Sequence, residues 1–200
     1  MTIDTDAARA ESHRYLGTTA DTLLRVRTEC LDDVVAAAGV LTDSLRSGGK
    51  LLICGNGGSA ADAQHLATEF VSTLTVDHPR PSIPVVALTT DTSLLTAVAN
   101  DFGVEHIFAR QVGSIGFEGD VLIAISTSGN SANVLRAAET ASGIGMRVVG
   151  LTGASGGDLA ALTDVCVRVP STVTAHVQEC HLAVEQLLAL LVERDLYPAG

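Results

Sequence analysis

Short apolar runs recur along the chain from residue 50 onward. They are LLIC (51–54), PVVAL (84–88), VLIAI (121–125), RVVGL (147–151) and VCVRV (165–169). Each run is followed by turn residues and then by apolar positions at helical spacing. Strands that are apolar throughout are buried on both faces, as in parallel sheets with helices on either side. The pattern predicts an α/β fold built on a five-stranded parallel sheet.

Helical periodicity dominates both ends of the chain. Residues 6–48 carry leucines and valines at helical spacing and end in Ser-Gly-Gly, which typically stops a helix. We expect two helices here, with a break near residues 28–31. Residues 174–194 indicate one long, largely buried helix. The proline-stiffened stretch HPRPSIP (78–84) connects elements of one domain, because another apolar run follows at once.

Composition limits the size and the partners of the protein. With 200 residues, 46% of them hydrophobic, the chain is long enough for one well-filled core and short for two. We therefore expect a single domain over residues 1–200. Aromatic residues make up only 3%, which disfavours base-stacking surfaces, and the formal charge of −11 opposes binding to nucleic acids or anionic membranes.

The cysteines and the N-terminal stretch indicate a cellular location. The chain has no C-x-x-C pair and no disulfide-like spacing, so we expect reduced thiols at Cys30, Cys54, Cys166 and Cys180. The stretch MTIDTDAARAESHRY is acidic and lacks the apolar segment of a signal peptide. No apolar run approaches the roughly 20 residues that span a bilayer. We expect a soluble, cytoplasmic protein.

A glycine-rich corner follows the first of these apolar runs. GNGGSA (55–60) formally matches the G-x-G-x-x-[GA] pattern of dinucleotide-binding folds. That pattern expects an acidic residue about 20 positions later, at the end of the second strand. Asp77 precedes that strand and Asp91 comes too late. A second interpretation, in which the glycines serve only a tight turn, stays open.

A second polar turn, STSGNS (126–131), follows the run VLIAI. Its four hydroxyls at a helix N-terminus can surround a phosphate, and the helix dipole adds positive charge there. Serine and threonine are also ordinary N-caps, but one or two would suffice for capping. Ligands of parallel sheets bind beyond the carboxyl ends of the strands. The two turns together favour a small phosphorylated ligand such as a sugar phosphate.

Titratable residues cluster near these turns. His65 and Glu69 lie four residues apart on one helix face, where they can bind a metal, exchange protons or form a surface contact. Asp62, at the mouth of the same helix, either joins this cluster or compensates the helix dipole. Polar residues also interrupt the C-terminal helix, where they are paired, functional or exposed to water or a subunit. These are Gln178, Glu179, His181, Glu185 and Gln186.

Together these segments resemble the sedoheptulose-7-phosphate isomerase (phosphoheptose isomerase) family of the sugar isomerase (SIS) superfamily. The resemblance covers almost the whole chain. It rests on CGNGGSAADAQH with Glu69 after it, ALTTDTSLLTAVANDFG (87–103), GDVLIAISTSGNSANVLRA (119–137), LTGASGGDLA (151–160) and VPSTVTAHVQECH (169–181).

The resemblance implies a SIS-type three-layer α-β-α sandwich that converts sedoheptulose 7-phosphate to D-glycero-D-manno-heptose 7-phosphate. It implies a homotetramer with sites at subunit interfaces. Residues 1–48 would serve oligomerisation and residues 49–200 would bind the sugar phosphate. It also implies one zinc ion per subunit.

Matching motifs then assign roles to single residues. The candidate substrate-binding residues, with Asp62 added for its position at the mouth of the helix, are Asn56, Gly57, Gly58, Asp62, Asn100, Asp101, Ser126, Thr127, Ser128, Ser131 and Gln178. The metal-associated positions are His65, Glu69, Gln178 and Gln186. The candidate catalytic residues are Glu69, His65 and Gln186.

Position 186 departs from the family. A histidine eight residues after the metal-associated glutamine serves there in both metal binding and acid-base chemistry, and here that residue is Gln186. An amide oxygen coordinates metals weakly and has no proton to exchange near neutral pH. We therefore expect weakened zinc affinity and activity unless Glu185, His181 or His176 compensates.

The chemistry of an aldose–ketose isomerase sets clear demands. A proton moves between adjacent carbons through an enediolate, which needs a base and a group that stabilises the oxyanion. We expect Glu69 to be the base and a zinc ion on His65, Glu69 and Gln178 to polarise the carbonyl. The alternative is a non-catalytic SIS protein, a sugar-phosphate-binding regulator or adaptor. Such relatives tend to lose the helix carboxylate, which is retained here as Glu69.

Overall fold

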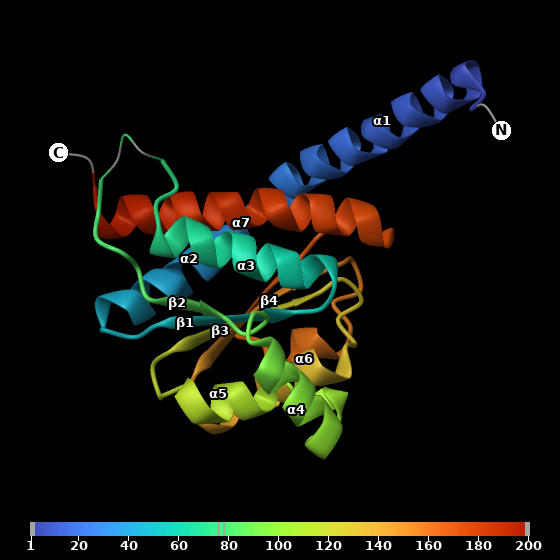
Figure 1. Cartoon of the computed structure of the whole chain (residues 1–200). Coiled ribbons are helices and arrows are strands. Elements are labelled where there is room, and N and C mark those ends of the chain that lie inside the picture. The colour runs from blue at the N-terminus through green and yellow to red at the C-terminus, as the bar shows by residue number, and fades with distance from the viewer. Residues whose placement is uncertain (1–2, 76, 78, 199–200) are drawn as a thin grey trace.

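A five-stranded parallel sheet forms the centre of the protein in the computed structural model, which describes residues 3–75, 77 and 79–198 (Figure 1). All five apolar runs form strands, as predicted. The strands are β1 (Leu51–Gly55), β2 (Val85–Ala87), β3 (Val121–Ser126), β4 (Arg147–Thr152) and β5 (Val165–Arg168). Their spatial order is β2-β1-β3-β4-β5, so β1 lies between β2 and β3. The strand order therefore reverses at β1, and ligands of open α/β sheets bind at such a point.

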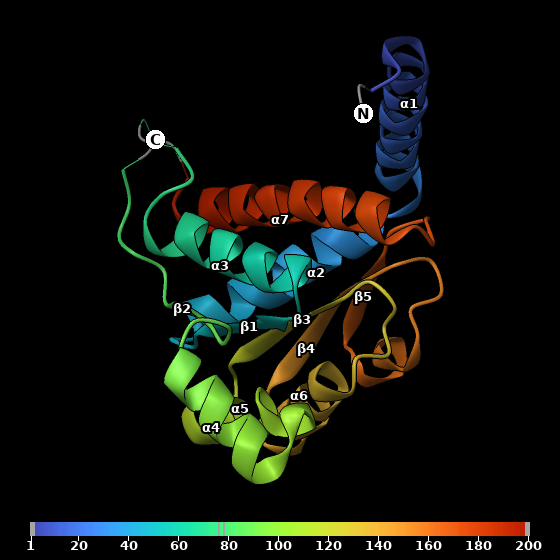
Figure 2. The same ribbon diagram turned by 45° about the vertical axis from the view of Figure 1, so that its right-hand side comes forward.

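Helices cover both faces of the sheet and complete the predicted α-β-α sandwich (Figures 1 and 2). On one face lie α2 (Leu31–Arg46), α3 (Gly58–Val71) and α7 (Thr174–Leu196). On the other lie α4 (Thr92–Phe102), α5 (Ala109–Ile115) and α6 (Ala132–Gly143). Two short 3-10 turns, η1 (Val104–His106) and η2 (Asp158–Leu162), join these elements.

Alternate residues of each strand enter different cores. In β1, Leu51 and Ile53 pack with Phe70 and Leu188 on the α3 and α7 side of the sheet. Leu52 and Cys54 pack with the cluster on the α5 and α6 side. All four β1 side chains are fully buried. Because side chains alternate across a strand, a sheet covered on both faces requires an unbroken apolar run.

The first helix, α1 (Thr5–Glu29), projects away from the sandwich (Figure 1). It ends at Glu29, within the predicted break, and α2 starts at Leu31. Only Thr22 and Val26 of α1 are buried. Several of its apolar side chains, including Leu16 and Leu24, are exposed. A helix with so little burial gains little from packing within one chain, which fits the predicted role in oligomerisation.

Other expectations concern thiols and membranes. All four cysteines are free, and three of them are buried. Across the residues that the structure describes, no helix combines the length and the apolarity that a membrane span requires.

Candidate active site

The glycine corner between β1 and α3 receives a side chain from α7. Gly57 has a φ of 56°, in the region that favours glycine, and serves as the N-cap of α3. At Gly58, an added Cβ would lie 2.4 Å from Nε2 of Gln178. The second glycine therefore makes room for the Gln178 amide at the N-terminus of α3. The structure thus brings three of the predicted substrate-binding residues together.

The serine-rich turn lies directly beside this corner, because β1 and β3 pair along their whole lengths up to Gly55 and Ile125. Asn56 and Asn133 exchange two hydrogen bonds of 2.8 and 2.9 Å between their side-chain amides. Asn133 is buried in the first turn of α6 and was not among the predicted site residues. The only sequence feature that could have pointed to Asn133 as a site residue was its place in the STSGNSAN motif. This amide pair fastens the two turns to each other.

The hydroxyls of the serine-rich turn are not used for helix capping. Ser131 is the N-cap of α6, yet its side chain makes no capping hydrogen bond. Its Oγ lies 3.0 Å from Oγ of Ser126. Ser128 Oγ accepts a hydrogen bond from the backbone of Asn130. Two adjacent hydroxyls at the positive end of a helix form a suitable cradle for an anion.

His65, Glu69 and Gln186 meet between α3 and α7. Nε2 of Gln186 lies 2.6 Å from Nε2 of His65 and 3.2 Å from Oε1 of Glu69. Nε2 of His65 and Oε1 of Glu69 are 3.2 Å apart. The imidazole is 46% exposed and the carboxylate is 18% exposed. The predicted imidazole–carboxylate pair is therefore accessible to a small molecule, with the α7 amide directly against it.

A second polar cluster lies buried beside this group. Glu185 is completely buried. Among the residues that the structure describes, neither of its oxygens has a hydrogen-bond partner, and Oδ2 of Asp62 also has none. Burial, together with a smaller contribution from the neighbouring Asp62 carboxylate, raises the pKa of Glu185 to about 9. Burial also raises the pKa of Asp62, although His65 acts in the opposite direction. Glu185 is thus protonated at neutral pH.

The two histidines considered as replacements for the family histidine have other environments. His181 is buried, and its Nε2 lies 3.1 Å from the backbone oxygen of Thr152. Burial lowers the pKa of His181 to about 4, so it is neutral at pH 7. His176 is bonded through Nδ1 to Thr19 of α1 and to Glu179. Both histidines therefore serve contacts away from the His65–Glu69 pair.

The remaining predicted substrate residues, Asn100 and Asp101, lie exposed at the C-terminal end of α4. Nδ2 of Asn100 donates a 2.8 Å hydrogen bond to Oδ1 of Asp101. This helix covers the sheet face opposite to α3 and α7 (Figure 2). Their predicted contact with the sugar stays a prediction.

These side chains do not fit a tightly held zinc ion. Zinc sites in proteins are built from cysteine, histidine and carboxylate ligands, commonly three or four of them. Within residues 3–75, 77 and 79–198, no three such side chains converge in a way that could hold a metal. The lone pair of the Gln186 amide nitrogen is delocalised into the carbonyl group and is not available to a metal. The predicted zinc ion remains untested, and the donor set indicates low affinity.

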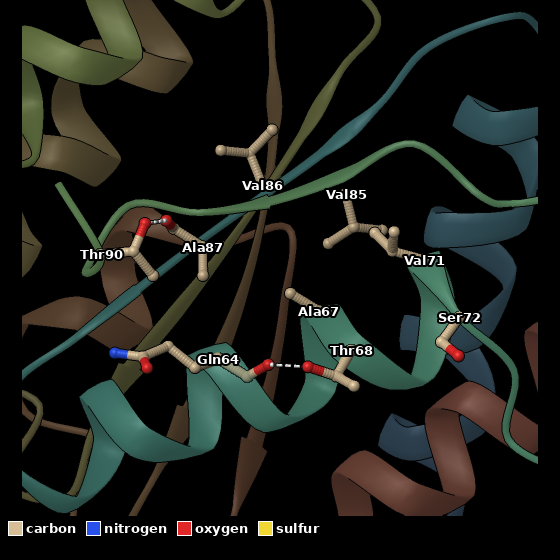
Figure 3. A pocket seen from close by; sticks show the side chains of 9 residues that line it. All are labelled: Gln64, Ala67, Thr68, Val71, Ser72, Val85, Val86, Ala87 and Thr90. Atoms are coloured by element: carbon tan, nitrogen blue, oxygen red, sulfur yellow. Dashed lines mark hydrogen bonds between the residues drawn. The ribbon is translucent and has the colours of Figure 1, made fainter.

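A separate hollow of about 470 Å³ lies between α3 and the edge strand β2 (Figure 3). Gln64, Thr68 and Val71 line it from α3, and Val86 and Thr90 line it from β2 and the residues after it. It contains none of the predicted substrate-binding, catalytic or metal-associated residues. The hollow is therefore distinct from the candidate active site.

Comparison with known proteins identifies the family of this chain. A family model described as SIS domain matches residues 14–153. The phosphoheptose isomerase of Rhodospirillum rubrum is 54% identical over 186 residues, which cover 93% of this chain and 97% of that protein. The phosphoheptose isomerase of a Roseiflexus species is 53% identical over 164 residues, or 82% of each chain.

Solved structures agree as well. A phosphoheptose isomerase from Francisella tularensis has a TM-score of 0.90 at 34% identity, over 97% of this chain and all of the other. The enzyme from Neisseria gonorrhoeae has a TM-score of 0.88 at 39% identity, over 93% and 98% of the two chains. By sequence along nearly its whole length and by fold, this chain belongs to the phosphoheptose isomerase family of SIS-domain proteins.

Proposed function

We propose that this protein is an aldose–ketose isomerase that interconverts sedoheptulose 7-phosphate and D-glycero-D-manno-heptose 7-phosphate. The observation that carries the proposal is the junction of two adjacent strand ends. There a hydroxyl-lined turn at the N-terminus of α6 is fastened by the Asn56–Asn133 amide pair to the corner that leads into His65 and Glu69. The names of the similar proteins support the same reaction.

The phosphate would bind at the serine-rich turn. The chain has a formal charge of −11, so the attraction for an anion has to be local. Hydroxyls of Ser126, Thr127, Ser128 and Ser131 and the backbone at the start of α6 supply donors without a cationic side chain. Anchoring the phosphate there places the other end of the sugar toward the neighbouring strand end.

Glu69 would move the proton between the first two carbons of the sugar. Its Oε1 accepts a hydrogen bond from the Gln186 amide, and its partial burial favours a directed contact with substrate. The developing enediolate carries negative charge on oxygen. The Gln178 amide and the N-terminus of α3 lie at the glycine corner, where they can stabilise that oxyanion. Glu69 would thus account for the proton that leaves C1 and the one that enters C2, and the proton of the C1 hydroxyl would pass to the C2 oxygen through water.

The test is turnover of the purified protein. Sedoheptulose 7-phosphate is added, and the aldose product is followed by nuclear magnetic resonance (NMR), with Glu69→Gln as the matched variant. We expect product with the natural chain and at least about 100-fold less with the variant. A protein that binds the sugar phosphate but forms no aldose would instead be a sugar-phosphate-binding regulator. Glutamine in place of the family histidine at position 186 is the observation that favours this second function.

We also propose that the protein works in the cytoplasm as a homotetramer. Four free cysteines suit a reducing compartment, and the exposed apolar side chains of α1 suit burial against other copies. Light scattering of the purified protein should give four times the chain mass. Removal of residues 3–29 should reduce that mass, and a tetramer that persists without α1 would contradict the assigned role of this helix.

A further inference from the structure

We propose that Gln186 organises the His65–Glu69 pair by hydrogen bonding, in the place that a metal ion would take, so that the site is assembled without a bound metal. The donor set at this site does not suit the expected zinc ion. The proposal rests on the proposed function only for its catalytic consequence.

The geometry is that of one donor group held between two acceptors. Nε2 of Gln186 lies 2.6 Å from Nε2 of His65 and 3.2 Å from Oε1 of Glu69, and those two acceptor atoms are themselves 3.2 Å apart. A side-chain amide nitrogen carries two hydrogen atoms. One can be donated to the imidazole and the other to the carboxylate.

The orientation of the amide follows from the charge of its partners. If the amide were turned over, its oxygen would face the Glu69 carboxylate, and two acceptors would repel each other. With the nitrogen inward, both contacts are favourable. His65 then accepts at Nε2, so its ring proton is on Nδ1.

This arrangement excludes a metal from the same two atoms. Coordination would require the lone pairs of His65 Nε2 and Glu69 Oε1 to point at the ion, but the amide hydrogens already occupy them. A metal would therefore have to break two hydrogen bonds. One of them has the charged Glu69 carboxylate as its acceptor, and hydrogen bonds to charged groups are stronger than those between neutral groups. The metal would gain at most a weak amide oxygen in return.

The arrangement also leaves a specific atom for chemistry. Both contacts of the Glu69 carboxylate with His65 and Gln186 use Oε1. Within the described part of the chain, Oε2 of Glu69 has no hydrogen bond or ion pair in the structure. Gln186 is then a positioning residue: it fixes the rotation of the carboxylate and leaves Oε2 for the substrate proton.

The first test is metal content, measured without substrate. The natural chain, Gln186→His and Gln64→His are saturated with zinc, dialysed and analysed by mass spectrometry, and zinc affinity is measured by calorimetry. Gln64 is a matched control because it lies on α3 but lines the separate hollow (Figure 3). We expect less than stoichiometric zinc in the natural chain and in Gln64→His, and at least about 10-fold tighter binding in Gln186→His. One tightly held zinc per natural chain would overturn the proposal.

The second test is the tautomer of His65, read from its ring nitrogen shifts by NMR and assigned by comparison with His65→Asn. We expect the Nδ1–H form in the natural chain and a mixture of forms in Gln186→Leu, which lacks the donor. Dominance of the Nε2–H form in the natural chain would overturn the proposal. Because neither readout uses turnover, a protein without isomerase activity but with these two results would refute the proposed function and leave this inference standing.

Discussion

Glu185 makes a sharp prediction about how stability depends on pH. Its side chain is fully buried on α7, and neither oxygen has a hydrogen-bond partner in the described part of the chain. Burial raises its pKa from the ordinary 4.5 to about 9. Between these two values the folded chain keeps a proton that the unfolded chain releases. The free energy of unfolding therefore falls as pH rises, by about 1.4 kcal/mol per pH unit from this group, and levels off above about pH 9.

The variant Glu185→Gln removes the ionisation while keeping the shape of the side chain. From pH 5.5 to 7.5 the natural chain should lose roughly 2.7 kcal/mol through Glu185, and the variant should lack this loss. The difference between the two slopes is the relevant quantity, because the buried amide has its own cost at every pH.

Urea unfolding followed by circular dichroism, at one protein concentration and several pH values, measures both slopes. Glu179→Gln is the control on the same helix. Hydrogen bonds from Tyr15, Thr19 and His176 offset the opposing effect of burial and hold the pKa of the Glu179 carboxyl below its ordinary value, so this control should keep the natural slope. An unchanged slope in Glu185→Gln would refute the assignment of a buried, protonated carboxyl.

Three further predictions address the chemistry and the fold. Glu69→Gln should lower turnover at least about 100-fold and leave the binding of inorganic phosphate, measured by calorimetry, within about twofold; retained turnover would remove Glu69 as the base. Gly129→Ala should destabilise the fold by more than about 2 kcal/mol in urea, because φ is 70° and the new Cβ would lie 2.0 Å from a backbone oxygen of the neighbouring loop. Gly143→Ala, with nothing within 4 Å, should change stability by less than about 1 kcal/mol. Glu193→Gln should cost about 3–5 kcal/mol, since it leaves the buried guanidinium of Arg80 without its carboxylate, and a neutral effect would contradict the ion pair.

Much of the fold follows from local pattern. Each strand could be predicted because a sheet covered on both faces needs unbroken apolar runs such as 121–125, and the break between the first two helices could be placed near Glu29. The spatial order of the strands could not. It depends on which side of β1 the chain returns to after α3, and no local pattern encodes that choice.

The candidate site divides in the same way. Helical periodicity places His65 and Glu69 on one face, so the pair could be predicted from four-residue spacing. The hydrogen bonds from Gln186 to His65 and Glu69 depend on how α7 packs across α3. This packing joins side chains that are separated by 121 and 117 positions in the sequence. The burial of Glu185 could not be predicted either. Adjacent residues of a helix point in different directions, and the elements that pack against α7 determine which of its side chains are buried and which are exposed to solvent.

Isomerisation in deuterated water shows whether Glu69 moves a proton on a sugar phosphate held between the ends of β1 and β3. The natural chain and Glu69→Gln are incubated with sedoheptulose 7-phosphate in D₂O, and the product is analysed by NMR. We expect aldose from the natural chain, with deuterium at C2 in the fraction of turnovers in which the proton on Glu69 exchanges with solvent before it reaches C2, and no product above background from the variant. Equal product from both proteins, or no product from a natural chain that binds the sugar phosphate, would contradict this role of Glu69.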